Sequence, residues 1–218
     1  DFDYTSPLLR VSIGDALLKI SDFIHISGGF SFTKSVGMQV TLDNDLTRQV
    51  NVNAFGGSNV DVFVGSGPYF VDSDGNGVIN RDDDRDGDAV GLVIENTDFG
   101  LVMMTATDGN KEKFKALKLN SELVAFVGID AFEFSARDVE VVYNGGSTQR
   151  VVNFSAFSGG SYLLDTGSGE IEFDASSKII KASVGNATLS IADNVFIDGA
   201  FAFTKESLSV TLTDAAQK

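Results

Sequence analysis

The chain has 218 residues, a formal net charge of -15, one histidine and no cysteine. Nucleic acid binds to basic surfaces, so the charge excludes that class of partner. Without cysteine or a second histidine, thiolate and histidine-rich zinc sites are also excluded, while the length is sufficient for a buried core.

The first residues carry no targeting signal. The chain opens with Asp1-Phe2-Asp3-Tyr4, without a basic segment followed by an apolar one. We therefore expect the chain to be a piece of a longer protein. Apolar runs such as residues 100–104 are far too short to cross a bilayer, so no transmembrane segment is predicted.

Apolar and polar residues alternate along most of the chain, and 23 glycines punctuate the alternation. Alternation with period 2 predicts β-strands, and the frequent breaks predict short ones. The best helical candidate, residues 111–119, fits a strand equally well. The sequence therefore predicts an all-β fold. In chain order the main runs are Leu18-x-Ile20, Ile24-x-Ile26, Phe30-x-Phe32, Val40-x-Leu42, Val50-x-Val52, Val60-x-Val62-x-Val64, Leu92-x-Ile94, Phe99-x-Leu101-x-Met103, Phe132-x-Phe134, Val139-x-Val141 and Val210-x-Leu212.

The chain also contains internal repeats. Residues 10–34 align without a gap on residues 181–205, and twelve of these twenty-five positions are identical. A second register, offset by 102 residues, places Phe30-x-Phe32 on Phe132-x-Phe134 and residues 51–57 on 153–159. The two registers divide the chain into a first copy (1–71), an inserted loop (72–88), a second copy (89–171) and a truncated third copy (172–218).

A repeated unit of strands without linkers favours stacking. Each unit alone would expose its Phe, Val and Ile side chains, and stacking buries them in a continuous core. We therefore predict a repeat-built, β-solenoid-like stack. The strand spacing also fits the alternative of tandem antiparallel β-sandwiches.

The inserted loop has seven aspartates and two arginines in seventeen residues. Alternate carboxylates on a curled backbone can point at one centre, and a glycine at position 6 of such a loop permits the sharp turn. This spacing predicts bound Ca²⁺, with affinity in the weak, extracellular range of roughly 0.1–1 mM. The predicted ligands of the first site are Asp72, Asp74, Asn76, the Val78 carbonyl and Asp83, with Gly77 at position 6. A second site would be formed or shared by Asp82, Asp84, Asp86 and Asp88.

Part of the second copy resembles a known group of proteins. Residues 89–94, 115–119 and 123–130 lead into the segment Phe132-Glu133-Phe134-Ser135-Ala136-Arg137-Asp138-Val139-Glu140-Val141. This sequence pattern resembles the long-period repeats of giant bacterial surface or secreted proteins of the haemolysin-type calcium-binding and adhesin classes. The aspartate loop is similar to the calcium loops of thrombospondin type 3 repeats. The resemblance implies an extracellular or cell-surface protein in which calcium rigidifies joints, with an adhesive or scaffolding role.

Catalytic candidates are few. Asp165-Thr166-Gly167-Ser168 matches the loop of aspartic proteases, but that chemistry needs two such carboxylates and the chain has no second Asp-Thr-Gly, so we interpret the segment as a turn. His25 aligns with Phe196 in the repeat, which favours a strand position that accepts an aromatic ring. We therefore expect a protein that is not an enzyme.

The sequence thus predicts a calcium-stabilised structural or adhesive segment of a large extracellular bacterial repeat protein. Its expected partners are neighbouring repeats of the same chain or further copies, with surface glycans or proteins as additional candidates. Two alternative functions stay open at this point. One is a calcium-dependent carbohydrate-binding module, and the other is a self-assembling filament or matrix subunit.

Overall fold

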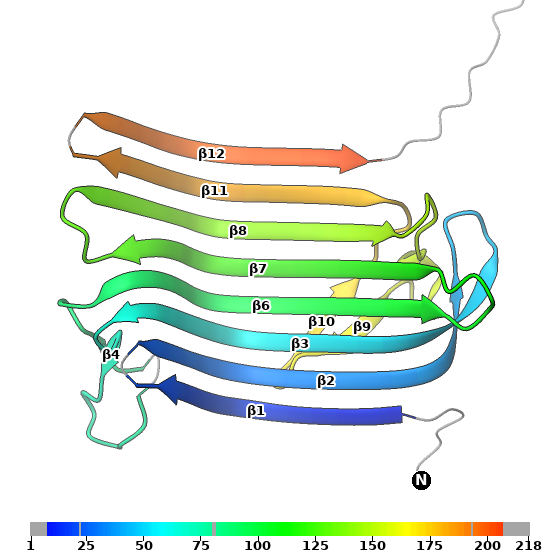
Figure 1. Cartoon of the computed structure of the whole chain (residues 1–218), viewed down its shortest axis with the longest axis horizontal. Coiled ribbons are helices and arrows are strands. Elements are labelled where there is room, and N and C mark those ends of the chain that lie inside the picture. Colours follow the sequence, from blue (N-terminus) through cyan, green and yellow to red (C-terminus); the bar gives the residue numbers. More distant parts are fainter. Residues whose placement is uncertain (1–7, 22, 80–81, 193, 207–218) are drawn as a thin grey trace, which may run out of the picture.

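The computed structural model describes residues 8–21, 23–79, 82–192 and 194–206, and these confirm the all-β prediction. Eight strands form one antiparallel sheet in the order β1-β2-β3-β6-β7-β8-β11-β12 (Figure 1). The predicted run Val210-x-Leu212 lies outside the described residues. The strands are β1 (Leu8–Ile20), β2 (Ile24–Thr41), β3 (Thr47–Ser66), β6 (Val90–Ala106), β7 (Lys113–Val127), β8 (Phe132–Gly146), β11 (Ile179–Ile191) and β12 (Val195–Glu206).

These strands are longer than the sequence pattern predicts. Residues that resemble turn signals lie inside strands. Two of them, Asn59 and Asn96, lie at bulges where the pairing of β3 with β6 shifts its register. Asn59 in β3, Asn96 in β6 and Asp138 in β8 all have positive φ angles, of 49°, 49° and 53°. Such bulges shift the alternation by one residue without ending the strand. The runs Val50-x-Val52 and Val60-x-Val62-x-Val64 are therefore two halves of β3, and the helical candidate 111–119 lies mostly in β7.

One face of the sheet is covered at its centre by residues 151–173. This segment contains the 3₁₀ helix η1 (Phe154–Ala156) and the hairpin of β9 (Tyr162–Asp165) and β10 (Glu170–Phe173), which lies behind the sheet in Figure 1. Side chains of the cover pack on the inward-facing residues of β3, β6 and β7. The buried cluster comprises Val40, Leu42, Val50, Val52, Ala54, Val102, Met104, Phe114, Ala116, Val152, Phe154, Leu164, Ile171 and Phe173. Burial of each large side chain contributes about 1.5–3 kcal/mol, so this cluster is the main core.

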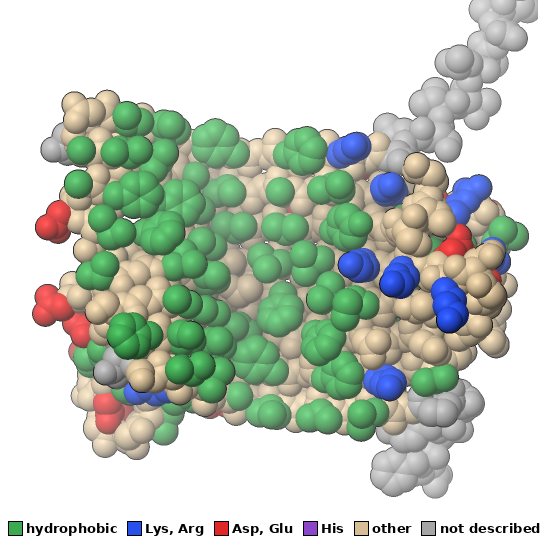
Figure 2. Space-filling view, in the orientation of Figure 1, with side chains coloured by type: hydrophobic (Ala, Val, Ile, Leu, Met, Phe, Trp, Pro, Cys, Tyr) green, Lys and Arg blue, Asp and Glu red, His purple; other side chains and the backbone are tan. Residues whose placement is uncertain are grey.

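The opposite face of the sheet is apolar and uncovered within the described residues. Figure 2 shows hydrophobic side chains spread over all eight strands on this face. They alternate with the core residues, so that Phe55 is exposed while its neighbour Ala54 is buried. Phe126 on β7 and Phe203 on β12 are also exposed, at 40% and 57%. We call this surface the open face.

The repeat with offset 171 corresponds to repeated structure. The hairpin β1–β2 pairs Ile13 with Phe30, and the hairpin β11–β12 pairs the equivalent Val184 with Phe201. Both hairpins also have a bulge at the same point of the first strand. The register with offset 102 corresponds only in part, because Phe30 and Phe132 both lie in strands, whereas residues 51–57 lie within β3 and 153–159 include η1. The solenoid-like stack is not confirmed, since eight of the described strands form one antiparallel sheet and the other four form two short two-stranded sheets.

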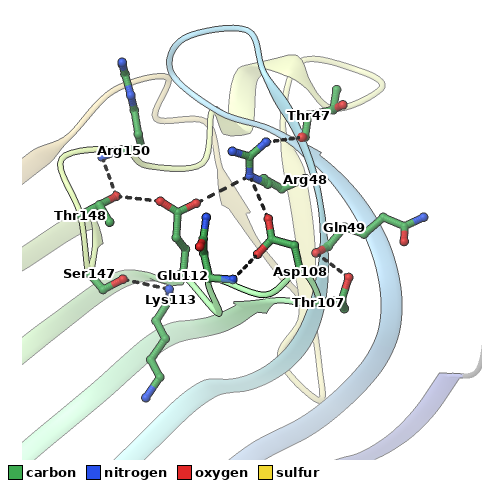
Figure 3. Close-up of polar contacts among 11 residues, drawn as sticks. Thr47, Arg48, Gln49, Thr107, Asp108, Glu112, Lys113, Ser147, Thr148 and Arg150 are labelled. Atoms are coloured by element: carbon green, nitrogen blue, oxygen red, sulfur yellow. Dashed lines mark hydrogen bonds and ion pairs between the residues drawn. The ribbon is translucent and has the colours of Figure 1, made fainter.

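A polar network joins the loops at one end of the strands (Figure 3). The Arg48 guanidinium in β3 lies 3.5 Å from the Asp108 carboxylate and 3.6 Å from that of Glu112, both in the β6–β7 turn. The Thr148 hydroxyl, from the loop after β8, donates to Glu112 at 3.3 Å. This network ties three connections together at the end of the sheet that is remote from the aspartate loop.

Candidate metal centre

The aspartate loop leaves the sheet between β3 and β6. At its base, β4 (Phe70–Val71) pairs antiparallel with β5 (Asp84–Arg85). The Tyr69 and Phe70 rings, which precede the loop, pack into a second buried cluster with Phe63 of β3. The loop therefore begins and ends on a short two-stranded base that is anchored to the sheet by aromatic packing.

Three of the predicted ligands lie together. Carboxylate oxygens of Asp72, Asp74 and Asp83 all lie within 4.8 Å of one another. Among the described residues, these three side chains form the group of acidic or histidine residues whose ligand atoms lie close enough together to hold one metal ion. Asp72 and Asp74 are exposed, whereas Asp83 is only 7% exposed. Three carboxylates at such distances repel one another, and a divalent cation between them would remove that repulsion.

Backbone amides curl the first part of the loop around these side chains. The Gly77 amide donates to Asp72 at 3.0 Å, and the Asn76 amide donates to Asp74 at 3.0 Å. Gly77 has a φ of 80°, a backbone conformation that residues other than glycine rarely adopt. The calcium motif requires such a turn at position 6. The Ser73 amide and hydroxyl donate to Asp83 at 3.0 and 3.4 Å, which holds position 12 near position 1.

Two other predicted ligands of the first site lie in the same turn. The Asn76 side-chain oxygen accepts a hydrogen bond from the Val78 amide at 2.6 Å, and its side-chain nitrogen donates to Asp74 at 2.6 Å. In this arrangement the amide group of Asn76 supports the turn, and the nitrogen faces the carboxylate. Coordination by the Asn76 oxygen and by the Val78 carbonyl remains a prediction.

The residues of the predicted second site are spread along the loop and its return to the sheet. Asp84 lies in β5, the Asp86 carboxylate accepts from the Asp88 amide at 3.0 Å, and the Asp86 amide donates to the Tyr69 carbonyl at 2.8 Å. Asp82 is exposed in the turn before Asp83. The structure thus brings Asp72, Asp74 and Asp83 together, and a second site at Asp82, Asp84, Asp86 and Asp88 remains a prediction.

The donor set suits a hard cation. Carboxylate oxygens are the ligands that Ca²⁺ prefers, and calcium sites accept irregular geometry and additional water ligands. The group contains neither the imidazole nor the thiolate that zinc and copper favour. Chemically, the loop can hold one oxygen-ligated divalent ion and join its two ends through it.

A buried polar pair next to the loop was not predicted from the sequence. The Tyr69 hydroxyl donates to the Glu95 carboxylate of β6 at 2.8 Å, and the Arg85 guanidinium of β5 lies 2.6 Å from the other oxygen of Glu95. Burial and the hydrogen bond to Glu95 raise the pKa of Tyr69 above its ordinary value. No spacing rule connects these residues, since they meet only through the pairing of β3 with β6 and of β4 with β5.

The two residues considered as catalytic candidates, His25 and Asp165, make packing and turn contacts. His25 lies on β2 with its ring against Phe70, and its Nε2 atom is 3.1 Å from the Ile79 carbonyl of the loop. Asp165 ends β9, where its carboxylate accepts from the Gly167 amide at 2.8 Å within the β9–β10 turn. The interpretation of the Asp165 segment as a turn is therefore confirmed.

Comparison with family models, with curated proteins and with solved structures finds no match for this chain. Within the described residues, no helix has the length and apolar character needed to span a membrane.

Proposed function

We propose that this chain is a calcium-stabilised structural segment of a large extracellular repeat protein, with an adhesive or scaffolding role. The observation that carries the proposal is the meeting of Asp72, Asp74 and Asp83 within 4.8 Å on a loop whose spacing follows a calcium motif. The repeated hairpins β1–β2 and β11–β12 support the repeat part of the proposal. The solenoid-like arrangement of successive units and the cell-surface location are further parts of the same proposal.

The proposed mechanism is mechanical. Asp72 follows β4 directly, while Asp83 precedes β5 directly, so an ion held by both carboxylates ties the two ends of the loop. The β4–β5 base is attached to β3 and β6 through the rings of Tyr69 and Phe70 and through the Glu95–Arg85 ion pair. Calcium would therefore stiffen the crossing from β3 to β6, and metal removal would loosen it.

The test is a calcium titration of metal-stripped protein, followed by thermal unfolding. Binding to the folded state alone raises stability by about 2.7 kcal/mol when free calcium is 100 times Kd, so Tm rises with calcium concentration. Replacing Asp74 and Asp83 together by Asn retains hydrogen-bond acceptors and removes two charges. We expect this double variant to lose the rise.

The matched control is Asp130→Asn, which removes a carboxylate from the β7–β8 turn and leaves the group intact. It should respond to calcium as the unmodified chain does. A Tm that is independent of calcium up to several millimolar, or an equal response in the Asp74/Asp83 variant, would show that the loop is not a calcium site.

A further inference from the structure

The outer edge of β1 is unpaired within the described residues, although β1 repeats a strand that is paired on both sides. β1 pairs only with β2, and all but one of its residues are exposed. Its repeat equivalent β11 pairs with β12 on one side and with β8 on the other, and most of its residues are half-buried. The edge of β1 that faces solvent is therefore the equivalent of the edge of β11 that binds β8.

On β11, three alternate residues contact β8. The Lys181 ammonium lies 2.7 Å from Glu140, and the Ser183 hydroxyl donates to the same carboxylate at 3.4 Å. At Gly185 the backbone passes close to Asp138 of β8, so that an added Cβ would lie 2.9 Å from the Asp138 Cβ. Lys181 and Ser183 thus both bind the Glu140 carboxylate. Gly185, which has no side chain, leaves room for Asp138.

All three features recur on β1, at the positions 171 residues earlier. Arg10 takes the place of Lys181, Ser12 that of Ser183 and Gly14 that of Gly185. Within this structure β1 makes little use of them. Arg10 is exposed, Ser12 donates to Asp165 at 3.3 Å, and a Cβ on Gly14 would meet only the Gly167 carbonyl oxygen, at 3.7 Å.

Lys19 offers a further charge at this edge. It stands where β11 has Ser190, and Ser190 is the Cα partner of Glu133 in β8. A β8-type strand placed on β1 in the same register would therefore have Glu133 opposite Lys19, and Glu140 opposite Ser12 and diagonal to Arg10, as Glu140 is to Lys181. Opposite charges at such cross-strand positions are stabilising.

The opposite edge of the sheet does not repeat its recognition set. In β2, Ser27 is the Cα partner of Asp61 in β3, and the equivalent residue of β12 is Asp198. Gly29 of β2, where an added Cβ would lie 2.7 Å from the Ser58 hydroxyl oxygen, is replaced by Ala200. A β3-type strand on β12 would meet a like charge and a steric obstacle, so β1 is the edge that retains specific contacts.

We propose that the free edge of β1 is a docking site for a β8-type strand presented by a partner repeat unit. The partner strand runs antiparallel to β1 and has alternating apolar residues that extend the open face. It carries one carboxylate diagonal to Arg10 and a second one opposite Lys19. Docking is strand addition, in which backbone hydrogen bonds supply affinity and the side chains fix the register. The site is independent of the calcium loop, because none of its residues contributes to the Asp72, Asp74 and Asp83 group.

The experiment measures binding of a labelled peptide of residues 131–147 to the full chain by fluorescence anisotropy. We expect saturable binding that weakens at least about tenfold, or about 1.4 kcal/mol, in Arg10→Glu and in Gly14→Val. Combining Arg10→Glu with a Glu140→Lys peptide should restore affinity. Lys205→Glu, a charge reversal on β12 at the other edge, is the matched control and should bind as the unmodified chain does.

Cross-linking tests the register, which is possible because the chain has no native cysteine. Val184 of β11 is the Cα partner of Val139, so Ile13→Cys should form a disulfide with a Val139→Cys peptide. A Val141→Cys peptide is displaced by two residues, roughly 7 Å, and should not. Absent binding, equal cross-linking of both peptides, or binding that is indifferent to Arg10 and Gly14 would overturn the proposal. Preferential cross-linking of two Ile13→Cys chains would also overturn it, because β1 would then pair with itself.

Discussion

At the scale of single residues, the contact between Tyr69 and Glu95 links the base of the aspartate loop to β6. Glu95 is 9% exposed, and it is satisfied by the Tyr69 hydroxyl at 2.8 Å and by Arg85 at 2.6 Å. The Arg85 guanidinium also lies 5.8 Å from the centre of the Tyr69 ring. Removing one partner leaves the buried carboxylate short of a donor, which costs about 1–3 kcal/mol.

This contact predicts a pH-dependent effect of Tyr69→Phe. Because the folded state raises the pKa of Tyr69 above 10.0, its contribution to stability is fully present below that pH and declines as pH rises above it. The variant should be less stable than the unmodified chain at pH 7, and the difference should narrow at alkaline pH. Denaturant unfolding at both pH values measures this. A difference that is constant through pH 11 would contradict the raised pKa.

The aspartate ligands and the Tyr69 contact differ in how far the sequence predicts them. Asp72, Asp74 and Asp83 lie within one short loop, so their approach depends on local backbone turns that glycine and asparagine encode. Tyr69 and Glu95 approach through strand pairing between distant segments, which no local pattern specifies. The approach of the three aspartates could therefore be predicted from the sequence, whereas the contact between Tyr69 and Glu95 could not.

At the scale of elements, the β9–β10 hairpin is the cover of the core. Leu164 of β9 faces the sheet and is 2% exposed, while its neighbour Leu163 points away and is 52% exposed. Tyr162 and Phe173, which pair across the hairpin, both pack against Phe154. The hairpin therefore contributes through alternate residues of one face, as expected of a strand pair lying on a sheet.

These two leucines give a matched test. Leu164→Ala should lower the free energy of unfolding by about 2–5 kcal/mol, because it leaves a cavity between the hairpin and the sheet. Leu163→Ala should change it by no more than about 0.5 kcal/mol. Urea unfolding measures both, with the midpoint shifting and the slope unchanged. Equal effects of the two substitutions would show that the hairpin is not the cover of the core.

Strand existence was predictable, but strand length and pairing were not. The alternating runs identified β1, β2, β3, β6 and β8, whereas β7, β11 and β12 contain none of the main runs. The pattern predicts short strands, whereas Asn59 and Asn96 lie at register shifts inside the continuous strands β3 and β6. The alignment with an offset of 102 residues likewise places residues 51–57 of β3 on residues 153–159, which include η1. Similar residue types form a strand in the first segment and a loop in the second.

At the scale of the whole molecule, the open face could not be predicted, because a period-2 pattern does not show which side of a strand is covered. In β3 the side of Val50, Val52 and Ala54 is covered, whereas Phe55 and Val64 are exposed within the described residues. Contiguous apolar surface of this kind marks an interaction surface. The net charge of -15 opposes association of two copies through it, because their fields repel at low ionic strength.

This opposition predicts association that depends on salt. Sedimentation velocity of the full chain should report monomers at about 10 mM salt and larger species near 1 M, where the Debye length falls from about 30 to 3 Å. Replacing Phe55 and Phe126 together by Ser makes two exposed positions of the open face polar and should keep the chain monomeric. Both positions are exposed, so folding should be retained, which circular dichroism checks.

The control for this last prediction is Leu46→Ser, which removes an exposed apolar side chain from the β2–β3 turn, outside the open face. It should associate with salt as the unmodified chain does, because the turn adds no area to the apolar surface. If the Phe55/Phe126 variant and the Leu46 variant associate alike, then screening of charge alone explains the salt effect. If the unmodified chain stays monomeric near 1 M salt, the open face does not bind a second copy, and its partner must differ in chemistry from this chain.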